Sequence, residues 1–254
     1  MTLDATLVAA FVLVMARTSA WVVAAPLFAS RGLSSIGRLA LALALSLFLA
    51  PIVVTGRALP TDVGPFAGLV LGQVLVGLLL GWATGLLMHA FEAAGTAIDT
   101  ASGLSIGSIL DPVSGTPAAV FARLTNMIFL ALLFATNAHH ALIEGFVRSF
   151  SAVPIDHFPV LGESSALAAG HAVTGILLAA LEIGAPVLGA LFLTEVALAL
   201  TSRFVPQANV FAVGLPVKVL VALLAVGSAL VFFPARLTGL LDSSLRTGAG
   251  LLGG

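Results

Sequence analysis

The sequence predicts an all-α membrane protein, a polytopic bundle of about six long, kinked helices arranged as hairpins. Of the 254 residues, 60% are hydrophobic and only 8% are charged, whereas a soluble domain carries roughly 25% charged residues. So few charges leave too little polar surface for a chain that folds in water. Polar and apolar residues do not alternate over any strand-length stretch, which argues against a transmembrane barrel. We expect a single domain over residues 1–254.

Charge-poor stretches place the helices, because a helix that crosses a bilayer needs ~20 mostly apolar residues. The first stretch covers residues 5–28 and contains Arg17, and the second covers 39–54. The third, 63–91, has no charge over its 29 residues. A helix of that length is roughly 44 Å long. Because this exceeds a ~30 Å hydrocarbon core, we expect the helix to tilt, kink or extend beyond the bilayer.

The rest of the chain predicts three more helices. The fourth apolar stretch covers 124–143 and the fifth covers about 166–200. Pro186 lies inside the fifth and is expected to kink or split it, because proline removes a helical hydrogen bond. The sixth stretch covers 210–233. The last two helices predict a C-terminal helical hairpin over about 166–235.

The composition also excludes several kinds of site. The chain has no cysteine, which rules out disulfides, thiolate metal sites and a cysteine nucleophile. Its net charge of −1 provides no basic face for nucleic acid. No HxxxH, HExxH or Walker A motif occurs, and a GxSxG match at 103–107 lacks the strand context of a hydrolase. We therefore expect no enzyme activity, no cofactor, no metal site and no nucleic-acid partner.

Three glycines form a ladder in the third predicted helix. Gly77, Gly81 and Gly85 recur at a spacing of four residues, which keeps them on one face of a helix. Glycine has no side chain, so a neighbouring backbone can approach closely along such a face. The ladder predicts close helix packing, either inside the chain or against a different subunit.

Seven charged residues qualify by position as intramembrane charges: Arg17, Glu92, Asp99, Arg123, Glu182, Glu195 and Lys218. Charges at membrane depth are costly and face protein or water rather than lipid. They can pair and so fix the register of neighbouring helices, or they can line a path for protons or cations. We favour the paired interpretation.

The segment 95–117 is rich in glycine and proline. Asp111 precedes Pro112, which disfavours helix at that point, so we expect a helix that unravels into a loop. Ile106, Ile109 and Leu110 are too apolar for a loop in water. Loop backbone at membrane depth is tolerated where protein buries it or where it lines an aqueous cavity. A pore-associated loop is therefore favoured over a surface connector.

A second interrupted segment covers 203–218. Pro206 and Pro216 bracket it, so continuous helix is disfavoured at both ends. Polar groups are concentrated there, and buried polar groups need partners. The segment predicts the turn of a helical hairpin, capped by the polar side chains Arg203, Gln207, Asn209 and Lys218.

Four groups of residues follow one another along the chain at characteristic spacings. They are Arg17, Pro26, Arg38, Ala42 and Pro51; Ala94, Gly95, Gly103, Asp111, Pro112 and Gly115; Asn137, His139, His140, Ser149, Phe150 and Pro154; and Arg203, Pro206, Gln207, Asn209, Val210, Phe211, Gly214, Pro216 and Lys218. In this order they resemble the flagellar biosynthetic protein FliR family, the R component of the type III export gate. The resemblance covers about residues 10–235. Gln73 departs from it, because the family leads us to expect an acidic residue ahead of the glycine ladder.

The resemblance implies a core component of the flagellar type III protein export gate, a helically wound assembly. With the P and Q components it would form the channel for unfolded flagellar subunits, and the B and A export components would be further partners. It implies the bacterial inner membrane and the flagellar basal body as the location, and it implies no enzyme activity. The loop at about 103–117 is similar to the plug that obstructs the closed channel.

Two sets of residues then have expected roles. The plug set is Gly103, Ile106, Gly107, Ile109, Leu110, Asp111, Pro112 and Gly115. The set expected in subunit packing or in a structural network is Gly77, Gly81, Gly85, Arg203, Pro206, Gln207, Asn209, Gly214, Pro216 and Lys218.

Two other functions stay open from the sequence. One is the T component of a virulence type III secretion injectisome, which has the same class of fold and a different cargo. The other is a small-molecule or ion transporter, for which inverted repeats and two matching broken helices are typical. The chain has interrupted segments near 103–117 and 203–216 but no convincing repeat between them.

Overall fold

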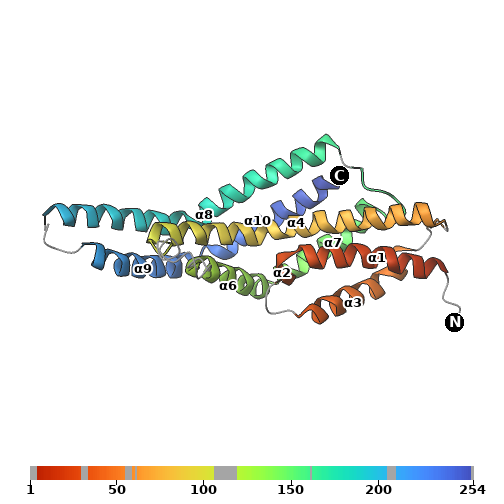
Figure 1. Ribbon diagram of the computed structural model, residues 1–254, viewed down its shortest axis with the longest axis horizontal. Helices are drawn as coiled ribbons and strands as arrows, with labels where there is room; N and C mark the ends of the chain where they lie inside the picture. Colours follow the sequence, from red (N-terminus) through yellow and green to blue (C-terminus); the bar gives the residue numbers. More distant parts are fainter. Residues whose placement is uncertain are drawn as a thin grey trace, which may run out of the picture. The chain divides into compact units, whose positions relative to one another are not determined.

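The computed structural model describes residues 5–29, 34–54, 59–60, 62–105, 119–160, 162–204 and 210–252. All regular secondary structure in these ranges is helical (Figure 1), so the all-α prediction is confirmed. The helices are α1 (Ala5–Ala24), α2 (Pro26–Ala29), α3 (Ser35–Val53), α4 (Val63–Ser102), α6 (Val120–Ala135), α7 (Ala138–Ala152), α8 (Glu163–Phe204), α9 (Val210–Ala229) and α10 (Phe233–Leu251).

The number of spans also agrees with the sequence. Five helices of the described chain are long and apolar enough to cross a membrane: α1, α3, α4, α8 and α9. The number rises to six if α6 and α7 together form one bent span. The chain is therefore a membrane protein of the predicted helical class.

The third predicted span is longer than expected. α4 has 40 residues and continues to Ser102, past the predicted end at residue 91. At 1.5 Å per residue it is roughly 60 Å long. The charges of Glu92 and Asp99 ended the apolar stretch in the sequence, but a charge does not end a helix. Asp99 is buried and hydrogen-bonded to backbone N–H groups.

The fourth predicted span, 124–143, is divided between two helices, α6 and α7. α6 and α7 are separated by a break and bent by 77°. Asn137 lies in the break with a φ of 56°, in the left-handed region that asparagine tolerates and that commonly ends helices. Hydropathy does not detect such a break, because both sides of it are apolar.

Two other differences concern the C-terminal third. Of the kink or split expected at Pro186, the split does not occur, because α8 runs through this residue as one helix of 42 residues. α10 was not predicted, because Arg236, Asp242 and Arg246 interrupt its hydropathy. It nevertheless buries an apolar face that includes Leu237.

The described helices pack into two compact units. The first takes its residues from Met1–Leu87, His139–Val173 and Leu241–Gly254, and the second from Met88–Ala138 and Thr174–Leu240. α4, α8 and α10 contribute residues to both units. The single export-gate domain expected over 1–254 stays a prediction.

The core of the first unit is built around an aromatic stack. The rings of Trp21 and Phe146 lie nearly parallel, with centroids 4.3 Å apart and planes inclined by 14°. Phe28 meets Trp21 edge-on at 5.0 Å, and Phe150 meets Phe146 edge-on at 5.5 Å. These contacts join α1, α2 and α7, and α3 packs against α1.

The second unit has a separate core. Phe91 of α4 lies with its ring centroid 5.2 Å from that of Phe129 in α6 and 5.9 Å from that of Phe233 in α10. A neighbouring cluster joins α4, α6, α8 and α9, and its buried members are Ile98, Phe121, Val187, Leu191, Ala222 and Val226.

Large apolar side chains also project away from both cores. Ile36 and Phe48 of α3 are 80% and 70% exposed, and Phe192 of α8 and Leu224 of α9 are 67% and 66% exposed. Apolar faces of this extent are found where lipid or another protein covers them. The exterior of the chain therefore agrees with the low charge of its sequence.

Candidate functional site

The glycine ladder lies where α4 meets α1. A Cβ placed on Gly77 would lie 2.3 Å from the backbone oxygen of Arg17, and one on Gly81 would lie 2.4 Å from the Cβ of Ala24. Both distances are far below van der Waals contact, so only glycine fits there. Gly85 is buried. The close packing that the ladder predicts is observed for two of its glycines inside the chain.

This close approach places Arg17 in the interior of the first unit. Its side chain is fully buried. Nε donates to Oε1 of Gln73 at 2.7 Å, Nη1 to Oγ of Ser149 at 3.2 Å, and Nη2 to the carbonyl oxygen of Val153 at 2.6 Å. The guanidinium carbon also lies 4.2 Å from the ring centroid of Phe150, in the range of a cation–π contact.

All of these partners of Arg17 are neutral groups. Gln73 stands where the family resemblance led us to expect an acidic residue, and its Nε2 donates to the carbonyl oxygen of Ile155 at 3.4 Å. No carboxylate of the described chain pairs with Arg17. A buried guanidinium without a counter-ion depends on complete hydrogen bonding, because unmet donors at this depth are costly.

The sequence did not identify these partners. Gln73 is fully buried and is the one amide side chain of the charge-free stretch 63–91, a feature of the sequence that could have identified it. Ser149 and the carbonyl of Val153 carry no such signal. They are brought to Arg17 by the course of α7 and the turn that follows it.

A second polar anchor joins the end of α4 to the start of α6. The carboxylate of Asp99 is 4% exposed and accepts the backbone N–H of Phe121 at 2.9 Å and of Ala122 at 3.0 Å. A carboxylate here satisfies donors of the first turn of α6 and interacts favourably with its dipole. A Cβ on Gly95 would lie 2.4 Å from Oγ1 of Thr125, so the two helices also approach closely.

α4 ends at a glycine of the predicted plug. Gly103 has a φ of 85°, and the N–H of Leu104 donates to the carbonyl of Asp99 at 3.1 Å. A left-handed glycine after the last turn is a common helix end. The helix thus ends at Ser102, and the loop expected after it begins at residue 103.

The remaining residues of the plug set lie outside the described residues. They are Ile106, Gly107, Ile109, Leu110, Asp111, Pro112 and Gly115. The described part contains the two helix ends that flank the loop, the end of α4 and the start of α6, and the hydrogen bonds of Asp99 hold them together. The chain therefore leaves α4 and enters α6 at neighbouring points.

The C-terminal signature is partly described. Arg203 is exposed near the end of α8, whereas Pro206, Gln207 and Asn209 lie outside the described residues. A Cβ on Gly214 would lie 3.3 Å from Cδ1 of Leu198 in α8. Pro216 is exposed and lies within α9.

The charges of the fifth and sixth predicted spans are paired. Nζ of Lys218 in α9 contacts the carboxylate of Glu195 in α8. Nη1 of Arg236 in α10 lies 3.0 Å from Oε2 of Glu182 in α8. Each pair joins two helices of the second unit, which is the register-fixing arrangement that we favoured. No group of histidine or acidic residues in the described chain has the arrangement of a metal site.

Comparison with known proteins identifies the family of this chain. The family described as "Bacterial export proteins, family 1" matches residues 8–244. The flagellar biosynthetic protein FliR of Bacillus subtilis is 33% identical over 231 residues, which cover 89% of each chain. The chain belongs to the FliR family of bacterial export proteins. FliR of Escherichia coli is 31% identical over 82% of this chain and 78% of its own.

The FliR family also has relatives outside the flagellum. The Yop proteins translocation protein T of Yersinia pestis is 29% identical over 179 residues, which cover 70% of this chain and 69% of the relative. The chain is thus a component of a type III export apparatus. The FliR proteins of Bacillus subtilis and Escherichia coli match it at higher identity and over more of its length than this relative does.

Proposed function

We propose that this chain is a core component of the flagellar type III protein export gate. It assembles with the P and Q components into the channel for unfolded flagellar subunits, with the B and A export components as further partners. It resides in the bacterial inner membrane at the flagellar basal body and has no catalytic role. The observation that carries the proposal is the 33% identity to Bacillus subtilis FliR over 89% of both chains. The apolar exterior of α3, α8 and α9 supports it, because partner subunits can cover these faces.

Within this gate, the loop at 103–117 acts as the plug. The helix ends on either side of it, in α4 and α6, are held together by Asp99 and by the close contact at Gly95. Ile106, Ile109 and Leu110 can seal the passage without recognising any sequence, since apolar contacts are non-directional. The left-handed Gly103 provides a point at which the loop can change direction.

Affinity purification tests the assembly. The chain is tagged, the membrane is solubilised in mild detergent, and the co-purifying proteins are identified by mass spectrometry. We expect P-like and Q-like subunits in fixed ratio to the tagged chain. A homodimer alone would contradict the proposal and favour a transporter. Partners encoded with a virulence secretion system would place the chain in an injectisome.

Deletion of residues 106–110 tests the plug. We expect the assembled gate to leak small solutes while its subunits still co-purify, because the helix ends that flank the loop and their Asp99 anchor remain. Gly68→Ala provides an assembly-competent control, since a Cβ there meets nothing within 4 Å. Unchanged leakage from an assembled deletion variant would remove the plug role.

A further inference from the structure

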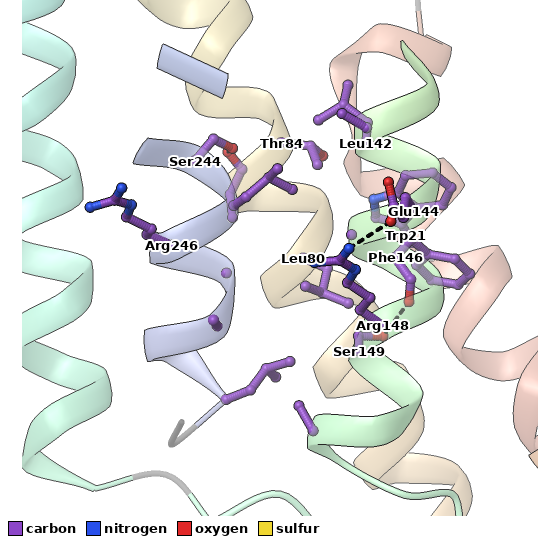
Figure 2. A pocket seen from close by; sticks show the side chains of 18 of the residues that line it. Trp21, Leu80, Thr84, Leu142, Glu144, Phe146, Arg148, Ser149, Ser244 and Arg246 are labelled. Atoms are coloured by element: carbon purple, nitrogen blue, oxygen red, sulfur yellow. Dashed lines mark hydrogen bonds and ion pairs between the residues drawn. The ribbon is translucent and has the colours of Figure 1, made fainter. Parts of the chain in front are cut away.

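The first unit contains a cavity of about 410 Å³ between α4, α7 and α10, with α1 behind it (Figure 2). A water molecule occupies only ~30 Å³, and ligand pockets start at about 300 Å³. The cavity is therefore large enough for part of an organic ligand. Its apolar lining includes Trp21, Leu80, Leu142, Phe146, Leu245 and Leu252.

One polar group in this lining has no partner. Trp21 is 1% exposed, and its indole Nε1 is buried without a hydrogen-bond partner in the described chain. The ring is held by its stack on Phe146 and is drawn with its nitrogen on the cavity side (Figure 2). Buried donors are nearly always bonded in native proteins, so this N–H points to an acceptor outside the described part of the chain.

A cation lies at the exposed side of the same cavity. Nη2 of Arg148 is 2.7 Å from Oε1 of Glu144, and their side chains are 77% and 62% exposed. Exposed pairs of this kind are weak. Because a guanidinium has five N–H groups, Arg148 can also bind an anionic oxygen. Arg246 also lines the cavity, but its guanidinium pairs with Asp242 at 3.5 Å and is drawn on the side of α10 away from Arg148 (Figure 2).

We propose that this cavity binds one phospholipid. One acyl chain lies among the leucines, an acyl-ester carbonyl accepts the N–H of Trp21, and the phosphate lies against Arg148. A lipid fits better than a partner helix, because helical backbone carbonyls already accept intrahelical bonds, whereas an ester carbonyl is a free acceptor next to apolar carbon. The proposal requires only that the chain lies in a membrane and does not rest on the export function.

Tryptophan fluorescence gives a direct test, because the chain has only two tryptophans. In Trp82→Phe, Trp21 is the single tryptophan fluorophore. The protein is placed in nanodiscs of dioleoyl phosphatidylglycerol or of its dibrominated analogue, whose bromines quench only at short range. We expect strong quenching of Trp21 although it is buried, and weaker quenching when Ala141→Phe narrows the cavity. Equal quenching with and without Ala141→Phe would overturn the proposal.

Native mass spectrometry of the detergent-purified protein tests the polar contacts. We expect one retained phospholipid, with retention reduced about tenfold in Arg148→Gln and in Trp21→Phe, since each loses one hydrogen bond to the lipid. Arg246→Gln is the matched control and should retain the lipid. Circular dichroism of each variant, and Trp82 fluorescence in Trp21→Phe, establish that it is folded. A folded wild type without lipid, or a partner polypeptide that shields Trp21 instead, would refute the assignment.

Discussion

Arg17 is held in the interior by neutral acceptors and an aromatic ring. Its guanidinium uses Nε, Nη1 and Nη2 in three bonds that reach α4, α7 and the turn after α7. The side chain thus ties together segments that are far apart in the sequence. With no carboxylate of the described chain beside it, the amide of Gln73 is the partner whose loss would matter most.

Gln73→Leu should destabilise the first unit. It leaves the buried Nε of Arg17 without an acceptor, at a cost of about 1–3 kcal/mol. Thermal unfolding in detergent should show a lower midpoint. Gln73→Glu keeps an acceptor and adds an opposite charge within hydrogen-bond distance, so it should unfold at or above the wild-type temperature. Equal midpoints for the leucine and glutamate variants would show that the Gln73 bond contributes nothing.

At the scale of elements, glycine contacts decide how closely helices pack. α4 meets α1 through Gly77 and Gly81, and it meets α6 through Gly95. In each case the missing Cβ leaves room for atoms of the neighbouring helix. A Cβ on Gly64 or Gly68, near the start of α4, would meet nothing within 4 Å. Glycine is therefore required only where α4 approaches another helix closely.

Gly77→Ala should separate α4 from α1. Its Cβ would overlap the backbone oxygen of Arg17, and backbone cannot rotate away as a side chain can, so we expect a loss of about 1–3 kcal/mol. Gly68→Ala is the matched control in the same helix. It should be neutral or stabilise by up to about 1 kcal/mol, because alanine is the better helix former. Thermal unfolding of both variants in one detergent compares them, and equal midpoints would contradict the steric argument.

At the scale of the whole molecule, apolar surface dominates. The chain has 21 charged side chains among 254 residues, and the second unit pairs two of its acidic residues with cations on other helices. Exposed leucine and phenylalanine side chains cover much of α3, α8 and α9. A chain of this kind is stable only where lipid or other subunits cover it.

Site-specific crosslinking shows whether lipid or other subunits contact the apolar surface of α8. A photoreactive amino acid at Phe192, which is 67% exposed, should yield adducts with other export-gate subunits in cells. The same amino acid at Val187, which is fully buried on the same helix, should yield no adduct to another protein. If position 192 yields only lipid adducts while the gate is assembled, α8 faces the bilayer there and is not an interface.

The sequence by itself determined the class of this protein, because helix formation and membrane insertion depend on residues that are neighbours in the chain. Its apolar stretches located α1, α3, α4, α8 and α9, and its spaced motifs predicted the family that the comparisons establish. The break at Asn137, the burial of α10, the neutral partners of Arg17 and the unpartnered N–H of Trp21 were decided only by the tertiary structure. Each depends on which helices meet and at what register, and residues distant in sequence set that geometry.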